Sequence, residues 1–453
     1  MQTHWSNESV FYHIYPLGMF GAPEKNDFLS EPVERLTKLN EWIGYFNNMG
    51  INALYLGPLF ESSEHGYDTA DYYKVDRRLG TNNTLKQIVD KLHQNNIRVI
   101  LDGVFNHVGR DFRAFKDVKI NLENSSYREW FGGLNFAGTN CYNDPFVYEG
   151  WNGNYNLVKL NLLNPHVVNH LFEAIRMWIT EFDIDGLRLD VADCLDKTFL
   201  KQLNKFCKSI KKDFWLMGEV IHGDYRNWVS PDMLDSVTNY ECYKGLYSSH
   251  VDKNYFEIAY SLNRQFGEGG IYEGFSLYNF ADNHDVNRVV NSLSHPEHLY
   301  PLYFLLFSMP GVPSVYYGSE WGIEGKKNGN CDRALRPAIE ISDALNSAPH
   351  PELKNTIAKL IAVRKKSRAL KYGFYKQIHV NHEQFVFLRT FEEENILIAV
   401  NSNKAPVQIE ITLDGFSSGA YKDQMTGEFF TSENGSLSLT LWPNWGRVLM
   451  KQA

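Results

Sequence analysis

Eight short apolar runs, rich in β-branched and aromatic residues, recur between residues 10 and 317, and helix-period segments separate most of them. Such near-continuous hydrophobicity is typical of parallel strands that are covered on both faces. Eight strand–helix units favour an α/β fold, a closed (β/α)8 TIM barrel, over a doubly wound sheet. The expected strands are 10–15, 51–57, 97–104, 186–191, 215–220, 236–240, 275–280 and 312–317.

Helix start signals lie between the expected strands. Ser30 is expected to cap one helix, and Thr84 with Gln87 matches the capping-box pattern of another. Asn164 combines a favoured N-cap residue with a proline at the first helical position. Each helix would lead into the next strand, as a barrel requires.

Two segments interrupt this rhythm. Residues 108–164 are rich in Asn, Gly and aromatic residues, which indicates an irregular domain B inserted after the third strand. Beyond a helix over 352–370, the pattern changes to alternation and turns. We therefore expect a barrel of residues 1–107 and 165–371, and a C-terminal antiparallel β-sandwich domain over 372–453.

The charge balance argues against a nucleic-acid partner. The 453 residues contain 45 Lys and Arg against 54 Asp and Glu, a net charge of −9. No stretch concentrates basic residues with interleaved aromatics, as a phosphate-backbone site would need.

The sequence also lacks the usual features of membrane-bound or secreted proteins. The longest uncharged run, residues 299–318, contains three prolines. The five cysteines are scattered without a CxxC pair, and the N-terminal residues show no signal-peptide pattern. We expect a cytoplasmic protein without a membrane partner, and the oligomeric state stays open.

Ionisable residues gather at the expected carboxyl ends of the strands, where the active sites of barrel enzymes lie. The segments are DGVFNH at 102–107, GLRLDVAD at 186–193, MGEV at 217–220 and ADNHD at 281–285. Because buried charges are costly unless paired, stability alone does not explain three acids and an arginine converging there. Asp102, taken singly, is interpreted as a loop anchor.

Two of these acids have the spacing that glycoside hydrolysis needs. Asp190 and Glu219 end neighbouring strands, which lie about 4.8 Å apart, and retaining glycosidases need carboxyl groups about 5 to 5.5 Å apart. Arg188, on the same strand face as Asp190, is expected to keep that carboxylate ionised by lowering its pKa. Glu219, in a more apolar strand, is expected to hold its proton and act as the acid.

The segments DGVFNH, GLRLDVAD, GEVIH and FADNHD, in this order, resemble the four signature regions of the α-amylase family, glycoside hydrolase family 13. The resemblance implies that Asp190 is the nucleophile and Glu219 the general acid/base. It also implies that Asp285 stabilises the transition state by binding sugar hydroxyls, and that Arg188 positions Asp190.

The resemblance extends to residues that would bind the substrate. It implies that His107 and His284 hydrogen-bond the sugar that precedes the scissile bond. HGYDTADYY is similar to the segment in which Tyr67 stacks on that sugar and Asp68 lies close by. NCDRALRPAI is similar to a segment that makes Arg336 a sugar ligand, although its later residues depart from the family pattern.

The resemblance implies no required cofactor, and it leaves open whether the chain binds a structural metal ion. Many amylases bind structural calcium between the barrel and domain B, and Asn106 matches one ligand. Residues 108–164 contain no convincing set of carboxylate ligands to complete that site.

LVKLN at 157–161, EVIH and DSVTNYE are similar to the neopullulanase and cyclomaltodextrinase branch of the family. Val191 is a residue found in members that accept α-1,6 as well as α-1,4 linkages. That branch carries an N-terminal β domain, and here the first expected strand begins near Val10, so we expect this chain to lack the domain.

The function expected from the sequence is retaining hydrolysis of α-1,4 glucosidic bonds, with α-1,6 bonds as an open second linkage. The expected substrates are malto-oligosaccharides, cyclodextrins or pullulan-type glucans, cleaved through a glycosyl-Asp190 intermediate. A transglycosylase of the same family would use the same residues, with a sugar hydroxyl in place of water. A non-catalytic glucan-binding protein is the alternative from another class, because a fold does not imply activity.

Overall fold

The computed structural model describes residues 4–329, 331–412, 419–433 and 435–452. Eight parallel strands form one sheet in the order β11-β10-β9-β5-β2-β1-β13-β12, and a parallel bridge from Thr238 to Tyr278 closes it. All eight strands predicted from the sequence are therefore confirmed as a closed barrel. Their bounds are β1 Phe11–Ile14, β2 Ala53–Leu56, β5 Arg98–Gly103, β9 Gly186–Leu189, β10 Trp215–Gly218, β11 Ser236–Val237, β12 Tyr278–Phe280 and β13 Val312–Tyr316.

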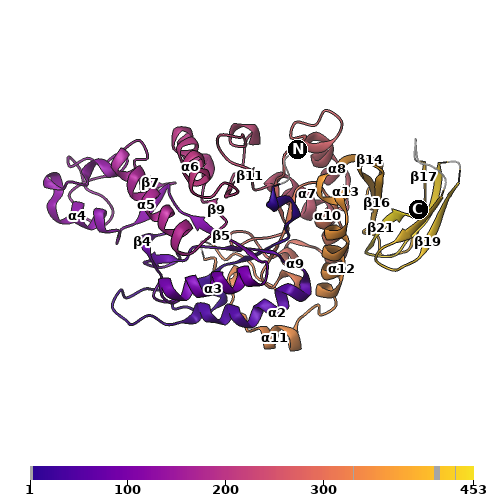
Figure 1. Cartoon of the computed structure of the whole chain (residues 1–453), viewed down its shortest axis with the longest axis horizontal. Coiled ribbons are helices and arrows are strands. Elements are labelled where there is room, and N and C mark those ends of the chain that lie inside the picture. Colours follow the sequence, from indigo (N-terminus) through magenta and orange to yellow (C-terminus); the bar gives the residue numbers. More distant parts are fainter. Residues whose placement is uncertain (1–3, 330, 413–418, 434, 453) are drawn as a thin grey trace.

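Apolar side chains fill the barrel interior, and helices surround the strands (Figure 1). The principal helices are α2 Leu39–Met49, α3 Asn82–Gln94, α5 Pro165–Glu181, α6 Lys197–Ile210, α7 Tyr240–Val251, α8 Phe256–Phe266, α10 Leu299–Ser308 and α12 Leu353–Lys366. Shorter helices are α1 Pro16–Met19, α9 Val289–Ser292, α11 Ile341–Ser347 and α13 Arg368–Tyr372. Within the described residues, no helix is both long enough and apolar enough to cross a bilayer.

Two of the expected helix starts are wrong, and one is confirmed. The helical segment expected from Ser30 begins only at the 3-10 turn Arg35–Lys38, while the Ser30 amide donates to Asp27 in a separate turn. The capping box lies one turn earlier than expected, because Thr81 and Thr84 exchange amide and hydroxyl hydrogen bonds. Asn164 caps α5 as expected, accepting from the His166 amide at 2.9 Å.

Two small sheets lie in the loops at the carboxyl ends of barrel strands. One comprises β3 Phe60–Ser62 and β4 Thr69–Val75, between β2 and α3. The other, in the order β6-β8-β7, lies between β5 and α5 with helix α4 Arg113–Asn121 and a 3-10 turn, η4 Arg128–Trp130. Its strands are β6 His107–Gly109, β7 Gly150–Trp151 and β8 Asn154–Lys159.

The C-terminal part is an eight-stranded antiparallel sheet, at the opposite end of the molecule from α4 (Figure 1). Its order is β14-β15-β16-β21-β18-β19-β20-β17, and side chains from β15, β16, β17 and β20 share one apolar core. The strands therefore fold over one another in the manner of a sandwich. Their bounds are β14 Phe374–Val380, β15 Gln384–Phe391, β16 Glu394–Asn401, β17 Val407–Thr412, β18 Gly419–Asp423, β19 Phe429–Glu433, β20 Ser436–Leu441 and β21 Trp445–Lys451.

Candidate active site

The guanidinium of Arg188, in β9, joins three carboxylates at the mouth of the barrel. Its Nη1 lies 2.9 Å from Asp102 Oδ1 and 2.9 Å from Asp190 Oδ1, and its Nη2 lies 2.6 Å from Glu219 Oε1. The register of β9 and β10 pairs Leu189 with Gly218, so Asp190 and Glu219 follow these strands at the same level. The structure thus brings together the arginine and two of the acids that the sequence singled out.

Asp102 anchors the Tyr67 loop, as expected from the sequence, and it also belongs to this cluster. Its carboxylate accepts hydrogen bonds from the Tyr55 hydroxyl at 2.8 Å and the Tyr67 hydroxyl at 3.0 Å, besides contacting Arg188. It does hold the Tyr67 loop, but it also shares the positive charge of Arg188 with Asp190. In the sequence, the position of Asp102 in the DGVFNH segment was the signal for this second role.

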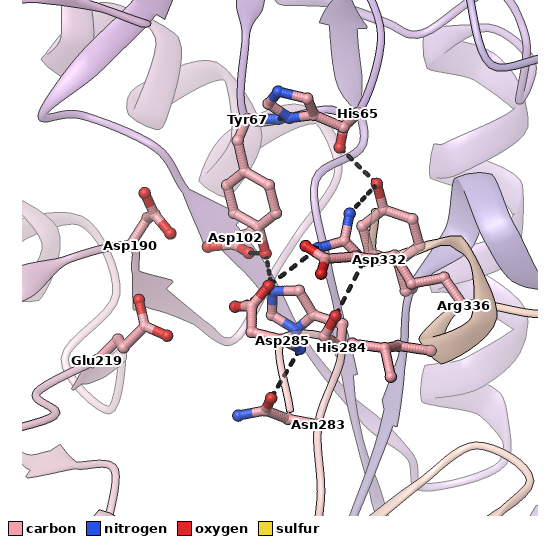
Figure 2. Close-up of polar contacts among 12 residues, drawn as sticks. His65, Tyr67, Asp102, Asp190, Glu219, Asn283, His284, Asp285, Asp332 and Arg336 are labelled. Atoms are coloured by element: carbon pink, nitrogen blue, oxygen red, sulfur yellow. Dashed lines mark hydrogen bonds and ion pairs between the residues drawn. The ribbon is translucent and has the colours of Figure 1, made fainter. Parts of the chain in front are cut away.

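His284 and Asp285 follow β12 and lie opposite Asp190 and Glu219 (Figure 2). His284 Nε2 lies 2.9 Å from Asp285 Oδ2 and also hydrogen-bonds the Tyr67 hydroxyl. The rings of Tyr67 and His284 are nearly parallel, 11° apart with centroids 5.4 Å apart. Tyr67 therefore connects the loop after β2 to the loop after β12.

Arg336 binds the other carboxylate oxygen of Asp285. Its Nη2 lies 2.9 Å from Asp285 Oδ1, and its Nε donates to the His284 carbonyl at 3.0 Å. The same Nη2 is 3.2 Å from Asp332, and the guanidinium lies over the Tyr15 ring. Arg336 is thus held in place from several sides and contacts the acid rather than standing free.

Burial and charge act differently on the three acids. Burial raises the pKa of Asp190 well above its usual range and raises the pKa of Glu219, and Arg188 offsets only part of each shift. For Asp285 burial acts in the same sense, but His284, Arg336 and Arg188 outweigh it and hold the pKa below its usual range. The expected contrast between an ionised Asp190 and a protonated Glu219 does not follow from these directions, because Arg188 contacts both.

His107 faces Asp190 from β6, and its Nε2 has no hydrogen-bond partner in the part of the chain that the structure describes. That atom lies 3.8 Å from Asp190 Oδ2, and burial lowers the imidazole pKa to about 3, so the ring is neutral at pH 7. The Asn106 side-chain amide lies 3.2 Å from His107 Nδ1. Asn106 therefore orients the imidazole through Nδ1, the ring nitrogen that does not face Asp190.

Asn106 is held by two contacts within the chain, and its role as a calcium ligand stays a prediction. Its backbone carbonyl accepts from the Leu160 amide, and its side chain is engaged with His107. Across the described ranges, no group of three or more His, Cys, Asp or Glu residues is arranged to hold a metal ion. The oxygen cluster that calcium prefers is therefore not assembled by acidic residues here.

Asp68 lies apart from the cluster of acids. Its carboxylate, in a residue only 3% exposed, accepts from the Glu64 amide at 2.8 Å and the Gly66 amide at 3.2 Å. It stabilises the turn that presents Tyr67, and the structure does not bring it to Asp190 or Glu219.

Two further residues, which the sequence did not single out, link the two faces of the site. The Tyr240 hydroxyl lies 3.5 Å from Glu219 Oε1 and receives a hydrogen bond from Asn283 at 3.0 Å. Asn283 in turn accepts from the Asp285 amide at 2.9 Å. Asn283 lies within ADNHD, so its motif was a signal, whereas the role of Tyr240 depends on the fold.

Comparison with known families agrees with this geometry. The model of the α-amylase catalytic domain matches residues 35–346, and that of the maltogenic amylase C-terminal domain matches residues 375–445. The chain belongs to the α-amylase family. This membership, in glycoside hydrolase family 13, confirms the family resemblance of the four segments.

The similarity to individual relatives in the α-amylase family covers nearly all of this chain. Neopullulanase 2 of Thermoactinomyces vulgaris is 30% identical over 98% of this chain and 78% of that protein. The cyclomaltodextrinase of Geobacillus thermopakistaniensis is 29% identical over 98% and 77%. The chain is thus a glycoside hydrolase of the amylase and cyclomaltodextrinase type.

Solved structures of the family are also similar to this chain over nearly its whole length. A cyclomaltodextrinase superposes with a TM-score of 0.87 at 25% identity, covering 99% of this chain and 78% of that one. The debranching enzyme of Nostoc punctiforme superposes with a TM-score of 0.83 at 28% identity and covers all of both chains.

Proposed function

We propose that this glycoside hydrolase cleaves α-1,4 and α-1,6 glucosidic bonds with retention of configuration, through a covalent glycosyl-Asp190 intermediate. The observation that carries the proposal is the shared guanidinium, because Asp190 and Glu219 each bind one terminal nitrogen of Arg188. Retaining enzymes need two carboxyl groups about 5 to 5.5 Å apart, and a guanidinium shared by Asp190 and Glu219 supports a separation of that size rather than the wider one of inverting enzymes.

In the proposed first step, an Asp190 oxygen attacks the anomeric carbon while Glu219 gives its proton to the glycosidic oxygen. The bond between that carbon and oxygen breaks, the shortened glucan leaves, and an ester to Asp190 forms. In the second step Glu219 takes a proton from water, whose oxygen attacks the anomeric carbon and releases Asp190. Two inversions at the same carbon restore the α configuration.

The surrounding residues would bind and orient the sugar. Asp285, kept ionised by His284 and Arg336, would accept hydrogen bonds from two sugar hydroxyls and favour the positive charge that develops in the transition state. His107 has a free Nε2 beside Asp190 and would contact the sugar held there. Arg336 acts on the substrate through Asp285 in this proposal, and Asp68 through Tyr67.

The substrate class is an extension from the relatives. Their names describe enzymes that act on cyclomaltodextrins and pullulan, and one solved neighbour is named a debranching enzyme. Malto-oligosaccharides, cyclodextrins and pullulan-type glucans are therefore the proposed substrates. An intracellular site of action is also proposed, since a Bacillus subtilis relative, 26% identical over 90% of this chain and 70% of its own length, is named an intracellular maltogenic amylase.

A product time course on maltoheptaose, β-cyclodextrin and pullulan tests this proposal, with chain length and anomeric form both resolved. The Glu219→Gln protein is the matched control, because it keeps the side-chain shape and removes the acid. We expect α-anomeric maltose and glucose from the wild type only. β-Anomeric products would refute retention, products longer than the substrate would indicate a transglycosylase, and no turnover would favour a glucan-binding protein.

A further inference from the structure

A cavity of about 460 Å³ lies among the segments that follow barrel strands β2 and β5. It is formed where β4, the start of α4, the η4 turn and α5 meet. Its principal lining residues are Asp71, Tyr73, Phe112, Arg113, Trp130 and His170. In the described part of the chain, no hydrogen bond or ion pair joins these side chains to Arg188 or to its three carboxylates.

Two side chains of this cavity have nitrogen atoms that contact no polar group among the described residues. His170 Nε2 is buried and makes no hydrogen bond with any of these residues. The exposed Arg113 forms no ion pair with any described residue, and its guanidinium lies 5.8 Å from the centre of the Tyr127 ring. A buried donor without a partner is costly, so a bound acceptor at His170 would offset that cost.

The cavity also has an aromatic wall. Trp130 is half-buried, and the neighbouring rings of Tyr127, His170 and Phe112 are inclined to the indole by 88°, 50° and 37°. None of these described rings stacks in parallel on the indole, and Trp130 lines the cavity. Tyr73 adds a second ring, fixed because its hydroxyl donates to the His170 carbonyl at 2.9 Å.

The charges select the class of ligand. Asp71 and Arg113 present opposite charges, so neither an anion nor a cation would be matched by the whole lining. Burial lowers the pKa of His170, which makes the imidazole a neutral group at pH 7. A neutral molecule with many hydroxyls suits this set, since hydroxyls accept from Arg113 and donate to Asp71. Ligand pockets span about 300 to 1,000 Å³ and combine aromatic walls with a few polar groups.

We propose that this cavity is a second glucan-binding site, in which a glucosyl unit stacks on Trp130 and hydrogen-bonds Arg113, Asp71 and His170. The inference rests on the proposed function for the identity of the sugar. It would hold part of a long glucan while another part of the glucan occupies the active site. Short substrates, which cannot reach both places, would not depend on it.

Gel mobility in native gels containing glycogen tests the site without turnover, in an Asp190→Asn background. Trp130→Ala and Arg113→Ala are the test substitutions, and Tyr260→Ala, a 68% exposed aromatic on α8, is the matched control. We expect Trp130→Ala to weaken glycogen retention about fivefold, Arg113→Ala to weaken it about twofold, and Tyr260→Ala to leave it unchanged. Arg113 is exposed, so its variant does not depend on repacking the fold.

Hydrolysis of maltotriose separates this inference from the proposed function. With Asp190 intact, Trp130→Ala and Arg113→Ala should keep maltotriose kcat/KM within about twofold of the wild type while KM for glycogen rises. Unchanged glycogen retention in both test variants would overturn the inference, as would an equal loss on maltotriose and glycogen. If the wild type fails to cleave maltotriose but retention still depends on Trp130, the proposed function fails and this site stands.

Discussion

Arg336 Nη2 lies 2.9 Å from Asp285 Oδ1, so a side chain from the loop after β13 helps His284 to keep an acid that follows β12 ionised. The same arginine donates to the His284 carbonyl, which fixes the backbone next to that acid. Asp285 is therefore positioned by a residue that a motif search would classify as a sugar ligand.

Removing this contact should change the pH dependence of catalysis. Arg336 helps to hold the Asp285 pKa below its usual range against the effect of burial, so Arg336→Ala should raise that pKa. The acidic limb of the kcat/KM profile should move to higher pH, and kcat/KM at pH 7 should fall about a hundredfold. The exposed Arg333→Ala is the control, and an unmoved acidic limb in Arg336→Ala would contradict this role.

The acid and the nucleophile should respond differently to the leaving group. Glu219→Gln should lower kcat on maltotriose about a thousandfold, because the departing oxygen loses its proton donor. α-Maltosyl fluoride needs no proton to release fluoride, so its loss should be much smaller in Glu219→Gln. Asp190→Asn should be inactive on both substrates, and equal losses for the two substrates in Glu219→Gln would argue against the assigned roles.

Glu320 predicts a pH-dependent stability outside the active site. Burial raises its pKa from 4.5 to about 7, although Tyr12 and Tyr45 hydroxyls donate to it at 2.7 and 3.0 Å. Because the folded state binds this proton more tightly than the unfolded state, stability falls as pH rises from about 4.5 to above 7. The loss amounts to at most about 3 kcal/mol.

Glu320→Gln should remove this dependence. Urea unfolding at pH 5 and pH 8 should show the free energy of unfolding of the wild type falling relative to Glu320→Gln. The exposed Glu324→Gln serves as the control and should follow the wild type. Parallel behaviour of the wild type and Glu320→Gln would show that burial does not raise this pKa.

Val191 predicts backbone strain beside the acid. Its φ of +40° lies in the left-handed region, which β-branched residues rarely adopt, and its amide donates to Glu219 Oε2 at 3.1 Å. Val191→Gly should relieve the strain and raise the free energy of unfolding by about 1 kcal/mol, after the entropy cost of glycine. Val191→Ala is the matched control, and a glycine variant less stable than the alanine variant would refute the strain.

The sequence determined the barrel because each strand is a local run of apolar residues, buried on both faces, and each carries its pattern without help from distant residues. It also placed Arg188, Asp190 and Glu219 together, since residues that end neighbouring parallel strands must share one edge. The alternation and turns that predicted a β domain beyond residue 371 were equally local, and β15 and β16 pair there as a hairpin.

The residues that hold the acids in place follow from the packing of the folded chain. Arg336 meets Asp285, and Tyr240 meets Asn283, through loops whose paths depend on packing rather than on a local pattern. Asp68 stands beside Tyr67 in the sequence, yet backbone amides of its own turn bind its carboxylate. The alternation of a strand determines on which face of the sheet a residue lies. The contacts of its side chain depend on loop paths and rotamers, which are set by packing against residues far apart in the chain.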